Sequence, residues 1–287
     1  MNILVIGGTG TVGSQVVRGL LAKKTAVSVL TRDLDKGAKM LPGAKMVRGD
    51  LLDPGTVRSA FAGVDGVFML NPVGPTETHE GLMAVNGAML AGVKRFVYMS
   101  VQGLESAPYL PHFGSKIPVE FALSKSGIPY TILRPNNFYQ NDYLFKDVMM
   151  KYGVYPQPLG GKGTSRVDVC DIAEAAVIAL TNSGHEGKTY TLVGPEPLTG
   201  VRTAAIWSQA LGRPITYGGD DLDAWEKQAA QMMPPWMAFD FRMMYEFFQK
   251  DGFGASPADL AVLTKFLGHP PRRFEDFAAE TAKMWKS

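Results

Sequence analysis

Four glycines crowd into the stretch VIGGTGTVG, Val5 to Gly13, near the start of the 287-residue chain. Glycine loses more backbone entropy on folding than any other residue, so such density is tolerated where the chain must bend sharply or approach another group closely. The preceding NILVI (2–6) predicts a buried strand, and the following TVGSQVVRGLLAKK (11–24) predicts a helix. The chain is therefore expected to begin with a tight strand-to-helix connection.

The alternation of strand and helix continues through the first half of the chain. Strands are predicted at 26–30, 44–49, 66–70, 95–100 and 129–135, and helices at 54–63, 78–92 and 111–127. The strands are continuously apolar, as parallel strands covered by helices on both faces must be. Because such strands are joined by right-handed crossovers, the sequence predicts an α/β fold with a doubly wound parallel sheet of the Rossmann type.

The second half of the chain has a looser rhythm. It predicts a helix at 167–182, a strand at 188–194, a helix at 198–212 and a terminal helix at 274–285. Thr199 is suited to cap the helix that follows it, and Gly212 to end that helix. The fold is therefore expected to carry a smaller C-terminal α/β region beside the sheet.

The glycine bend has the spacing of a dinucleotide fingerprint. Gly8, Gly10 and Gly13 satisfy G-x-G-x-x-G, and Gly7, Gly10 and Gly13 satisfy G-x-x-G-x-x-G. The first glycine makes the turn, the second admits a diphosphate, and the third lets the helix, whose N-terminus attracts phosphate, pack on the strand. The alternative is a chance glycine-rich turn, but the flanking strand and helix favour cofactor binding. The predicted contacts in this stretch are Gly7, Thr9, Gly10, Thr11, Val12 and Gly13.

The end of the second strand indicates which dinucleotide is bound. In SVLTRDLDK, Arg32 directly follows the strand, and the planar guanidinium can pair with the 2′-phosphate of NADP. Asp33 leaves NAD as an alternative cofactor, because an acidic residue near this position holds the ribose 2′-hydroxyl in NAD binders. We predict NADPH as the preferred cofactor; a solvated turn is the alternative role for Arg32.

Ligands of such sheets lie at the carboxyl ends of the strands, so the next two strand ends are also candidates. Asp50 and Leu51 follow the third strand, where a carboxylate can meet the adenine amino group. Asn71 and Pro72 follow the fourth strand and are expected beside the ribose and diphosphate. The alternative for each is a turn or cap residue.

Composition limits the possible partners and compartment. The net charge is +2 and basic residues are dispersed, which argues against nucleic acid and membrane surfaces as partners. No apolar run approaches the ~20 residues of a membrane helix, and no signal peptide is apparent. The single cysteine, Cys170, suits a reducing compartment and is expected to pack within a helix. A cytoplasmic protein is expected.

Seven segments together resemble the NmrA-like branch of the atypical short-chain dehydrogenase/reductases. They are GGTGTVG, LTRD, GDLLD, YMSVQG, HFGSKIPVE, SGIPYTILRPNNFYQN and HEGKTYTLVG. The similarity covers nearly the whole chain and is strongest over 1–195. It implies an NADP-binding Rossmann domain at 1–153 plus about 166–185, and a C-terminal substrate-binding region at about 154–165 and 186–287.

The resemblance also implies further cofactor contacts and a departure from the usual catalytic residues. The implied contacts are Ser100, Lys116, Pro135, Asn136, Asn137 and Phe138. Most short-chain dehydrogenases use Ser with Tyr-x-x-x-Lys, but this chain has His112 where the tyrosine stands and keeps Lys116. Lys116 is expected at the nicotinamide ribose, and the alternative is a helix-surface pair with Glu120, four residues on. His112 is a candidate proton donor near neutral pH or a structural residue.

Because the chain lacks the tyrosine that donates a proton in most short-chain dehydrogenases, we expect a substrate that accepts hydride directly. Such substrates are azo compounds, quinones and triphenylmethane dyes. The segment MMPPWMAFDFRMMYEFF (232–248) is rich in the Met and aromatic side chains that adapt to flat rings, although a core or a dimer interface is the alternative. The predicted pocket residues are Tyr139, Trp225, Met233 and Trp236.

The sequence therefore predicts an NAD(P)H-dependent reductase of a small aromatic substrate. The alternative is a non-catalytic NADP(H)-binding redox sensor or regulator, which the family also contains. No metal is expected, because the four histidines lack ligand spacing, and a monomer or homodimer is expected.

Overall fold

The structure is a computed structural model that describes residues 1–286. The chain divides into two compact units. Unit 1 contains Met1–Pro135 and Val169–Leu192, and unit 2 contains Asn136–Asp168 and the described residues from Val193 onward.

Unit 1 is built on a parallel sheet with the strand order β3-β2-β1-β4-β5-β6-β8. The strands are β1 (Asn2–Ile6), β2 (Ala26–Thr31), β3 (Lys45–Arg48), β4 (Gly66–Met69), β5 (Arg95–Met99), β6 (Tyr130–Pro135) and β8 (Lys188–Leu192). The order reverses direction at β1, whose neighbours are β2 on one side and β4 on the other. The predicted α/β fold with a doubly wound parallel sheet is confirmed.

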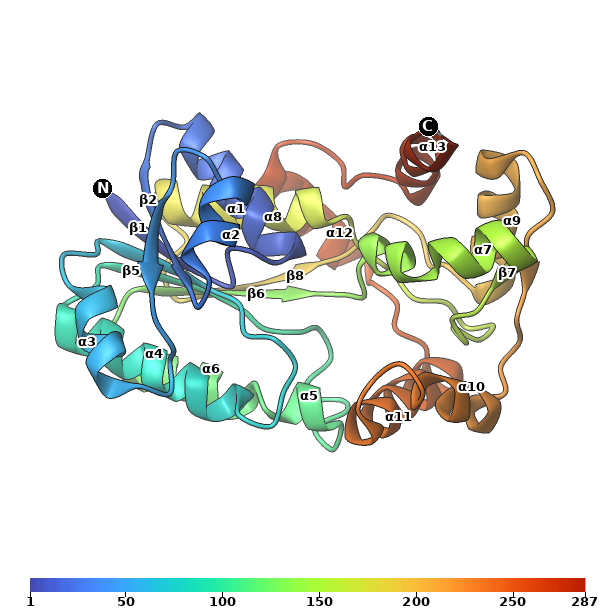
Figure 1. The fold of residues 1–287 in the computed structure, drawn as a ribbon, viewed down its shortest axis with the longest axis horizontal. Helices are drawn as coiled ribbons and strands as arrows, with labels where there is room; N and C mark the ends of the chain where they lie inside the picture. The colour runs from blue at the N-terminus through green and yellow to red at the C-terminus, as the bar shows by residue number, and fades with distance from the viewer. Residues whose placement is uncertain (287) are drawn as a thin grey trace. The chain divides into compact units, whose positions relative to one another are not determined.

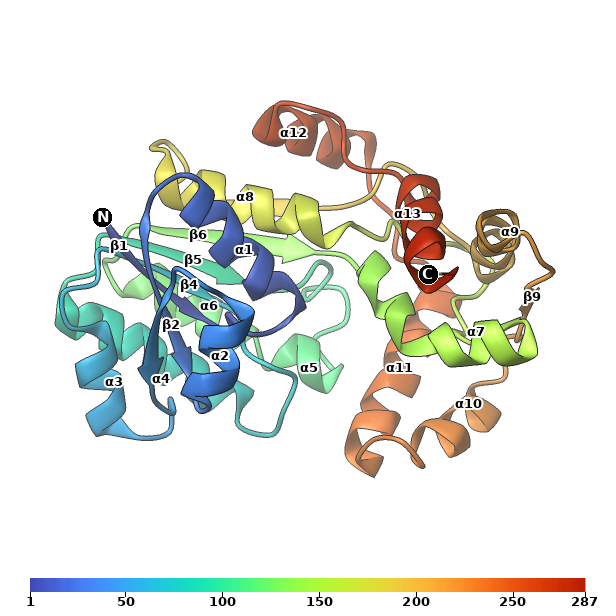
Figure 2. The ribbon, with the colours of Figure 1, turned by 45° about the horizontal axis from the view of Figure 1, so that its top comes forward.

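Helices cover both faces of this sheet, which explains why its strands are apolar throughout. On one face lie α3 (Pro54–Phe61), α4 (Glu77–Ala91) and α6 (Ile117–Lys125); on the other lie α1 (Thr11–Ala22) and α8 (Val169–Thr181) (Figures 1 and 2). Strand β1 is consequently inaccessible to solvent at Ile3, Leu4 and Val5. A short helix, α2 (Leu34–Met40), connects β2 to β3.

The single helix predicted at 111–127 is wrong, because the structure contains two helices there. α5 (Pro111–Gly114) ends before Ser115 and Lys116, and α6 begins at Ile117. Pro118 has no N–H to donate to the carbonyl of Gly114, and its ring would clash with that carbonyl in a continuous helix. The interruption places Lys116 at the start of α6 rather than in the middle of a longer helix.

Unit 2 is mainly helical. Its elements are η1 (Tyr139–Phe145), α7 (Lys146–Tyr152), β7 (Val154–Tyr155), α9 (Gly200–Leu211), β9 (Thr216–Tyr217), α10 (Leu222–Ala229), α11 (Pro235–Asp251), α12 (Pro257–Leu267) and α13 (Phe274–Lys286). β7 and β9 form a two-stranded parallel ladder. The predicted bounds of α9 are confirmed: the side chain of Thr199 accepts from the amide of Arg202, and Gly212 ends the helix at φ +68°.

The observed units differ from the predicted domain boundaries at two places. Residues 136–153, which we expected in the nucleotide-binding domain, belong to unit 2, where they form η1 and α7. Residues 186–192, which we expected in the C-terminal region, supply β8 to the sheet, where it pairs with β6. Among the described residues, no helix is both long and apolar enough to span a membrane.

Candidate active site

The carboxyl ends of five neighbouring strands bring the predicted cofactor contacts of unit 1 to one edge of the sheet. Gly7, Arg32, Asp50, Asn71 and Ser100 each lie one or two residues beyond the end of β1, β2, β3, β4 and β5. Because all of these strands are parallel, their ends share this edge. Such sheets bind ligands where the strand order reverses, which is beside β1 and β4.

The glycine bend at the end of β1 is packed too closely for side chains. Gly7 has φ +78°, a conformation that L-residues rarely adopt. A Cβ on Gly13 would lie 2.2 Å from the carbonyl oxygen of Gly7, so α1 packs directly on the bend. The amide of Gly10 donates to the same carbonyl at 3.0 Å and closes the turn. The turn at Gly7 and the close packing of α1 at Gly13 therefore agree with the fingerprint, and the role of Gly10 at a diphosphate stays a prediction.

The first turn of α1 has no side-chain cap. Gly10 is the N-cap residue and cannot cap with a side chain, and no acidic residue lies in the first turn. The amides of a helix N-terminus carry partial positive charge and attract anions. Since no side chain accepts from them, these amides can hold a diphosphate.

At the end of β2, Arg32 and Asp33 have different surroundings. Arg32 is exposed and makes no ion pair within the described part of the chain. Asp33 caps α2, because its Oδ1 accepts from the amide of Lys36 at 3.0 Å. At the end of β3, Asp50 accepts from the amide of Leu52 at 2.9 Å and Leu51 is buried. Of Arg32 and Asp33, the two residues predicted near the adenosine ribose, Arg32 is therefore the more available to a ligand.

Two buried polar atoms at the ends of β4 and β5 lack a hydrogen-bond partner among the described residues. They are Oδ1 of Asn71 and Oγ of Ser100, on side chains that are 3% and 2% exposed. A buried polar atom without a partner costs about 1–3 kcal/mol, so native proteins rarely leave one unless a ligand or water completes it. The residues at this edge thus fit a ligand with hydroxyl or amide groups. Pro72, beside Asn71, is exposed.

Lys116 is buried and pairs with Glu77, which lies at the first residue of α4. Glu77 also accepts from Oγ of Ser115 at 3.0 Å, and Thr78 donates to the carbonyl of Ser115 at 2.7 Å. The alternative prediction, a helix-surface pair of Lys116 with Glu120, is wrong. Helix α5 ends before Lys116 and α6 begins after it, and Lys116 pairs with Glu77 of α4 instead. An ammonium has three N–H groups, so the pairing with Glu77 leaves donors for a ribose hydroxyl.

Glu120 pairs instead with Arg134 near the end of β6. Nε and Nη2 of Arg134 donate to the two carboxylate oxygens at 3.0 and 2.6 Å, and Nη1 donates to Glu105 at 2.6 Å. Burial alone would lower the pKa of Arg134, but the two carboxylates raise it. Burial, and then the charges of Glu77 and Glu120, raise the pKa of the Tyr98 phenol well above 10. The phenol of Tyr98 therefore stays protonated near Glu77 and Glu120, each of which is paired with a cation.

His112 lies in α5 and is 9% exposed. Its ring packs edge-on against Phe113, with the ring centroids 4.7 Å apart. The side chain is therefore held in place by packing. Its role as a proton donor stays a prediction.

The predicted residues after β6 belong to unit 2, where hydrogen bonds hold them. Asn136 Nδ2 donates to the carbonyl of Phe253 at 2.8 Å, and Asn136 Oδ1 accepts from the amide of Asn137 at 2.7 Å. Arg166 donates to Oδ1 of Asn137 at 3.0 Å and to the carbonyl of Phe138 at 2.6 Å. The preceding Pro135 is buried and its carbonyl accepts from the amide of Gln102 at 3.0 Å.

Arg166 itself is held by a buried cluster around Asp142. Both side chains are fully buried, and Nη2 of Arg166 lies 2.7 Å from Oδ1 of Asp142. The other donors to this carboxylate are Tyr155, Gln157 and Trp207, at 3.2, 2.6 and 2.8 Å. Burial alone would lower the pKa of Arg166, but Asp142 raises it above its usual value. Sequence reasoning missed this cluster, because nothing in the stretch GTSRVDV marks a buried arginine.

The predicted pocket residues of unit 2 have different environments. The ring of Tyr139 is buried against Phe274 and Phe277, and its hydroxyl donates to the carbonyl of Arg272 at 3.1 Å. Trp225 is half-buried and packs edge-on against Tyr245, Met233 is half-buried, and Trp236 is exposed. Tyr139 is therefore part of the aromatic core of its unit, whereas Met233 and Trp236 offer accessible apolar surface.

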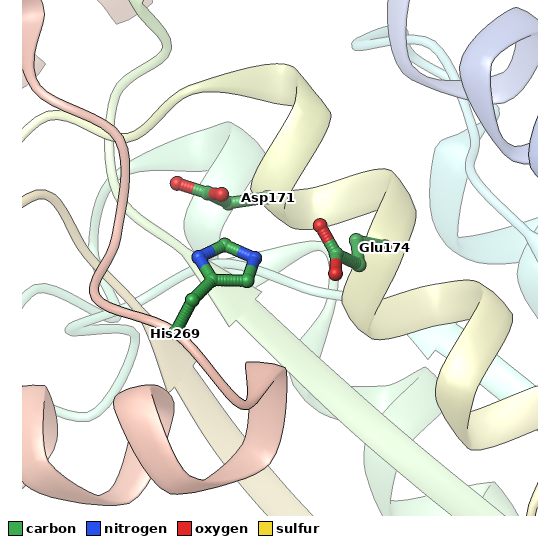
Figure 3. Close-up of side chains that lie close together, drawn as sticks. All are labelled: Asp171, Glu174 and His269. Carbon is green, nitrogen blue, oxygen red and sulfur yellow. The ribbon is translucent and has the colours of Figure 1, made fainter.

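Two carboxylates share one face of α8. Asp171 and Glu174 are three residues apart and project from the same side of the helix (Figure 3). His269, also labelled there, belongs to unit 2. A carboxylate pair provides only two of the four ligands of a typical structural zinc site, so the expected lack of a metal stays a prediction. Cys170 lies on this helix, as expected, but it is exposed, which does not support the expected packing role.

Known proteins resemble this chain over its whole length. It is 35% identical over 280 residues to NAD(P)H azoreductase from Xenophilus azovorans, with 96% of each chain covered. It is 32% identical over 285 residues to a (4-alkanoyl-5-oxo-2,5-dihydrofuran-3-yl)methyl phosphate reductase from Streptomyces griseus, with 99% of each covered.

The fold also matches a solved structure. An NADPH-dependent quinone oxidoreductase from Escherichia coli, solved in complex with NADPH, superposes with a TM-score of 0.87 at 24% identity, covering 99% of this chain and 100% of that one. The model of the NmrA-like family matches residues 1–278. This chain therefore belongs to the NmrA-like family.

Proposed function

We propose that the chain is an NADPH-dependent oxidoreductase that reduces a conjugated aromatic acceptor. The observation that carries this proposal is the sheet edge of unit 1. There, an uncapped helix N-terminus at Gly10 lies on the same edge as the unpartnered buried atoms of Asn71 and Ser100. The two reductases that resemble the chain over nearly all of its length support the same class of reaction.

A nicotinamide dinucleotide, when bound, supplies the hydride. The residues of this chain would bind and orient it: the Gly7–Gly13 bend at the diphosphate, Asn71 beside the ribose and diphosphate, and Ser100 and Lys116 toward the nicotinamide. Catalysis then consists mainly of holding the acceptor in position and excluding water.

The preference for NADPH over NADH is supported by the end of β2. Arg32 is exposed and pairs with no carboxylate among residues 1–286, so its guanidinium is available to a 2′-phosphate. Asp33, which would serve the ribose hydroxyl of NAD, is engaged as the cap of α2. A dianionic phosphate is thus the better match to this strand end.

The acceptor class is supported by what the chain lacks. His112 stands where related dehydrogenases carry a phenol acid, so an acceptor that takes hydride into a conjugated N=N or C=C bond suits the residues better than an alcohol–ketone pair. The relative from Xenophilus azovorans is an NAD(P)H azoreductase. We propose azo compounds and quinones, with water or His112 giving the proton, and Met233 and Trp236 contributing apolar contact.

The test is oxidation of NADPH by the purified chain, followed by the absorbance of the reduced nicotinamide. The acceptors are menadione, an azo dye and a triphenylmethane dye, each with a control lacking protein. Turnover with at least one acceptor is expected. Tight NADPH binding without turnover of any acceptor would overturn the reductase and leave the NADP(H) sensor.

A further inference from the structure

The amide of Asn71 has a defined orientation, because a glutamate holds one end of it. Nδ2 of Asn71 donates to Oε2 of Glu80 at 3.1 Å. The reverse orientation would place the amide oxygen against a carboxylate, where neither atom can donate. Glu80 therefore determines that Oδ1, and not Nδ2, is the atom of Asn71 left without a partner.

Glu80 is itself fixed by the first turn of α4. Its other oxygen, Oε1, accepts from Oγ1 of Thr76 at 2.7 Å, and its amide donates to the carbonyl of Thr76 at 2.9 Å. A carboxylate near a helix N-terminus is also favoured by the helix dipole. Both carboxylate oxygens are thus engaged, and the side chain has little freedom to release Asn71.

The strand register places Asn71 next to a second residue that has an unpartnered group. The pairing of β4 with β5 matches Gly66 with Arg95 and Met69 with Tyr98. Continued by two residues, this register pairs Asn71 with Ser100, whose buried Oγ also has no partner in the described chain. The edge therefore offers a pure acceptor and a hydroxyl at adjacent positions.

The chemistry of these two atoms distinguishes between parts of a dinucleotide. A diphosphate has only acceptors, so it cannot satisfy Oδ1 of Asn71, whereas a ribose hydroxyl can donate to Oδ1 and accept from Ser100. We propose that Glu80 is a positioning residue that orients Asn71 to receive a hydroxyl of the nicotinamide ribose rather than the diphosphate. This inference rests on the proposed function, and it narrows the predicted contact of Asn71 from ribose and diphosphate to ribose alone.

The test compares two ligands by calorimetry: NADPH, and 2′-phospho-ADP, which keeps the 2′-phosphate and the diphosphate but lacks the nicotinamide ribose. Glu80→Ala is expected to weaken NADPH binding about tenfold, about 1.4 kcal/mol, and to leave 2′-phospho-ADP binding unchanged. Asn71→Ala is expected to weaken NADPH to a similar degree, and adding Glu80→Ala to it should cause no further loss, because the two residues act through one contact.

Two control variants separate orientation from structure. Thr76→Val removes the hydrogen bond to the other oxygen of Glu80 without touching Asn71, and should weaken NADPH binding less than Glu80→Ala does while leaving 2′-phospho-ADP binding unchanged. Glu80→Gln keeps an acceptor for Nδ2 and should restore most of the NADPH affinity.

Equal weakening of both ligands by Glu80→Ala, or independent addition of the Glu80 and Asn71 effects, would overturn the inference while the proposed function stands. If the wild-type chain bound neither NADPH nor 2′-phospho-ADP measurably, the proposed function would be overturned, and this inference with it.

Discussion

The polar cluster around Asp142 in unit 2 and the polar groups at the ligand edge of unit 1 differ in how completely they are hydrogen-bonded. In unit 2, the carboxylate of Asp142 accepts hydrogen bonds from four side chains. The guanidinium of Arg166 donates to Asp142, to Asn137 and to the carbonyl of Phe138. In unit 1, Asn71 and Ser100 are just as deeply buried, yet each has an atom without a partner. Because a fully paired network needs nothing more, it indicates structure, whereas an unpaired buried atom at a ligand-binding edge indicates what the ligand must supply.

The largest effect is expected from breaking the paired cluster. Arg166→Met leaves Asp142 as an uncompensated buried charge and should lower the free energy of unfolding by about 3–5 kcal/mol. Urea unfolding followed by circular dichroism measures this change. Lys151→Ala is the control, because the pair of Lys151 with Asp147 is exposed at 3.6 Å and should contribute at most about 0.5 kcal/mol.

The same cluster allows a sharper test. The double variant Arg166→Met with Asp142→Asn removes both charges but keeps an acceptor for Trp207 and Gln157. It should unfold at a higher urea concentration than Arg166→Met alone, because no unpaired charge remains. A double variant no more stable than the single one would show that packing, and not the ion pair, dominates this core.

The second effect concerns the bend that unit 1 places at its ligand edge. In Gly13→Ala the new Cβ would lie 2.2 Å from the carbonyl oxygen of Gly7, so the bend must open. We expect a loss of about 1–3 kcal/mol in stability and at least a tenfold loss of NADPH affinity, measured by calorimetry. Gly161→Ala is the matched control, because its Cβ meets no atom within 4 Å. Unchanged affinity in Gly13→Ala would remove the bend from the cofactor site.

The contrast between the units also explains what the sequence could predict. The sheet, the glycine bend and the bounds of α9 follow from local patterns, such as apolar runs, Thr199 as a cap and Gly212 as a stop. α12 also carries a local signal: Ser256, its N-cap residue, and Asp259, in its first turn, form a capping box. These features depend on residues close together in the chain.

The polar contacts at the candidate site and in the Asp142 cluster join residues that are far apart in the chain. Glu77 and Lys116 are 39 residues apart, and Asp142 and Arg166 are 24 apart. Acidic residues such as Glu77 and Glu80 in a first helical turn suggest only a favourable dipole interaction. Their partners depend on how the parallel strands are ordered, which a single sequence leaves open.

The third prediction concerns the choice between NADPH and NADH at the end of β2. Arg32→Ala should weaken NADPH binding about tenfold or more, since a hydrogen bond to a charged group contributes about 1.5–3 kcal/mol, and should leave NADH binding nearly unchanged. Calorimetry with both cofactors measures the difference. An equal loss of both affinities would assign Arg32 to the fold of the turn instead of to the 2′-phosphate.

The smallest effect tests a polar group of unit 1 that has a partner and lies outside the ligand edge. Nδ1 of His185 lies 2.9 Å from the hydroxyl of Tyr190. Partial burial, and then the charge of Lys188, lower the pKa of His185 below its usual 6.5. Between the lowered pKa and 6.5 the unfolded chain binds more protons than the folded one, so the free energy of unfolding rises with pH in this window. Urea unfolding between about pH 5 and pH 7.5 should show this slope in the wild type, and His185→Gln should reduce it while leaving NADPH affinity unchanged. A variant that lost NADPH affinity without a change in slope would place His185 with the unpaired groups of the edge rather than with the paired groups of the fold.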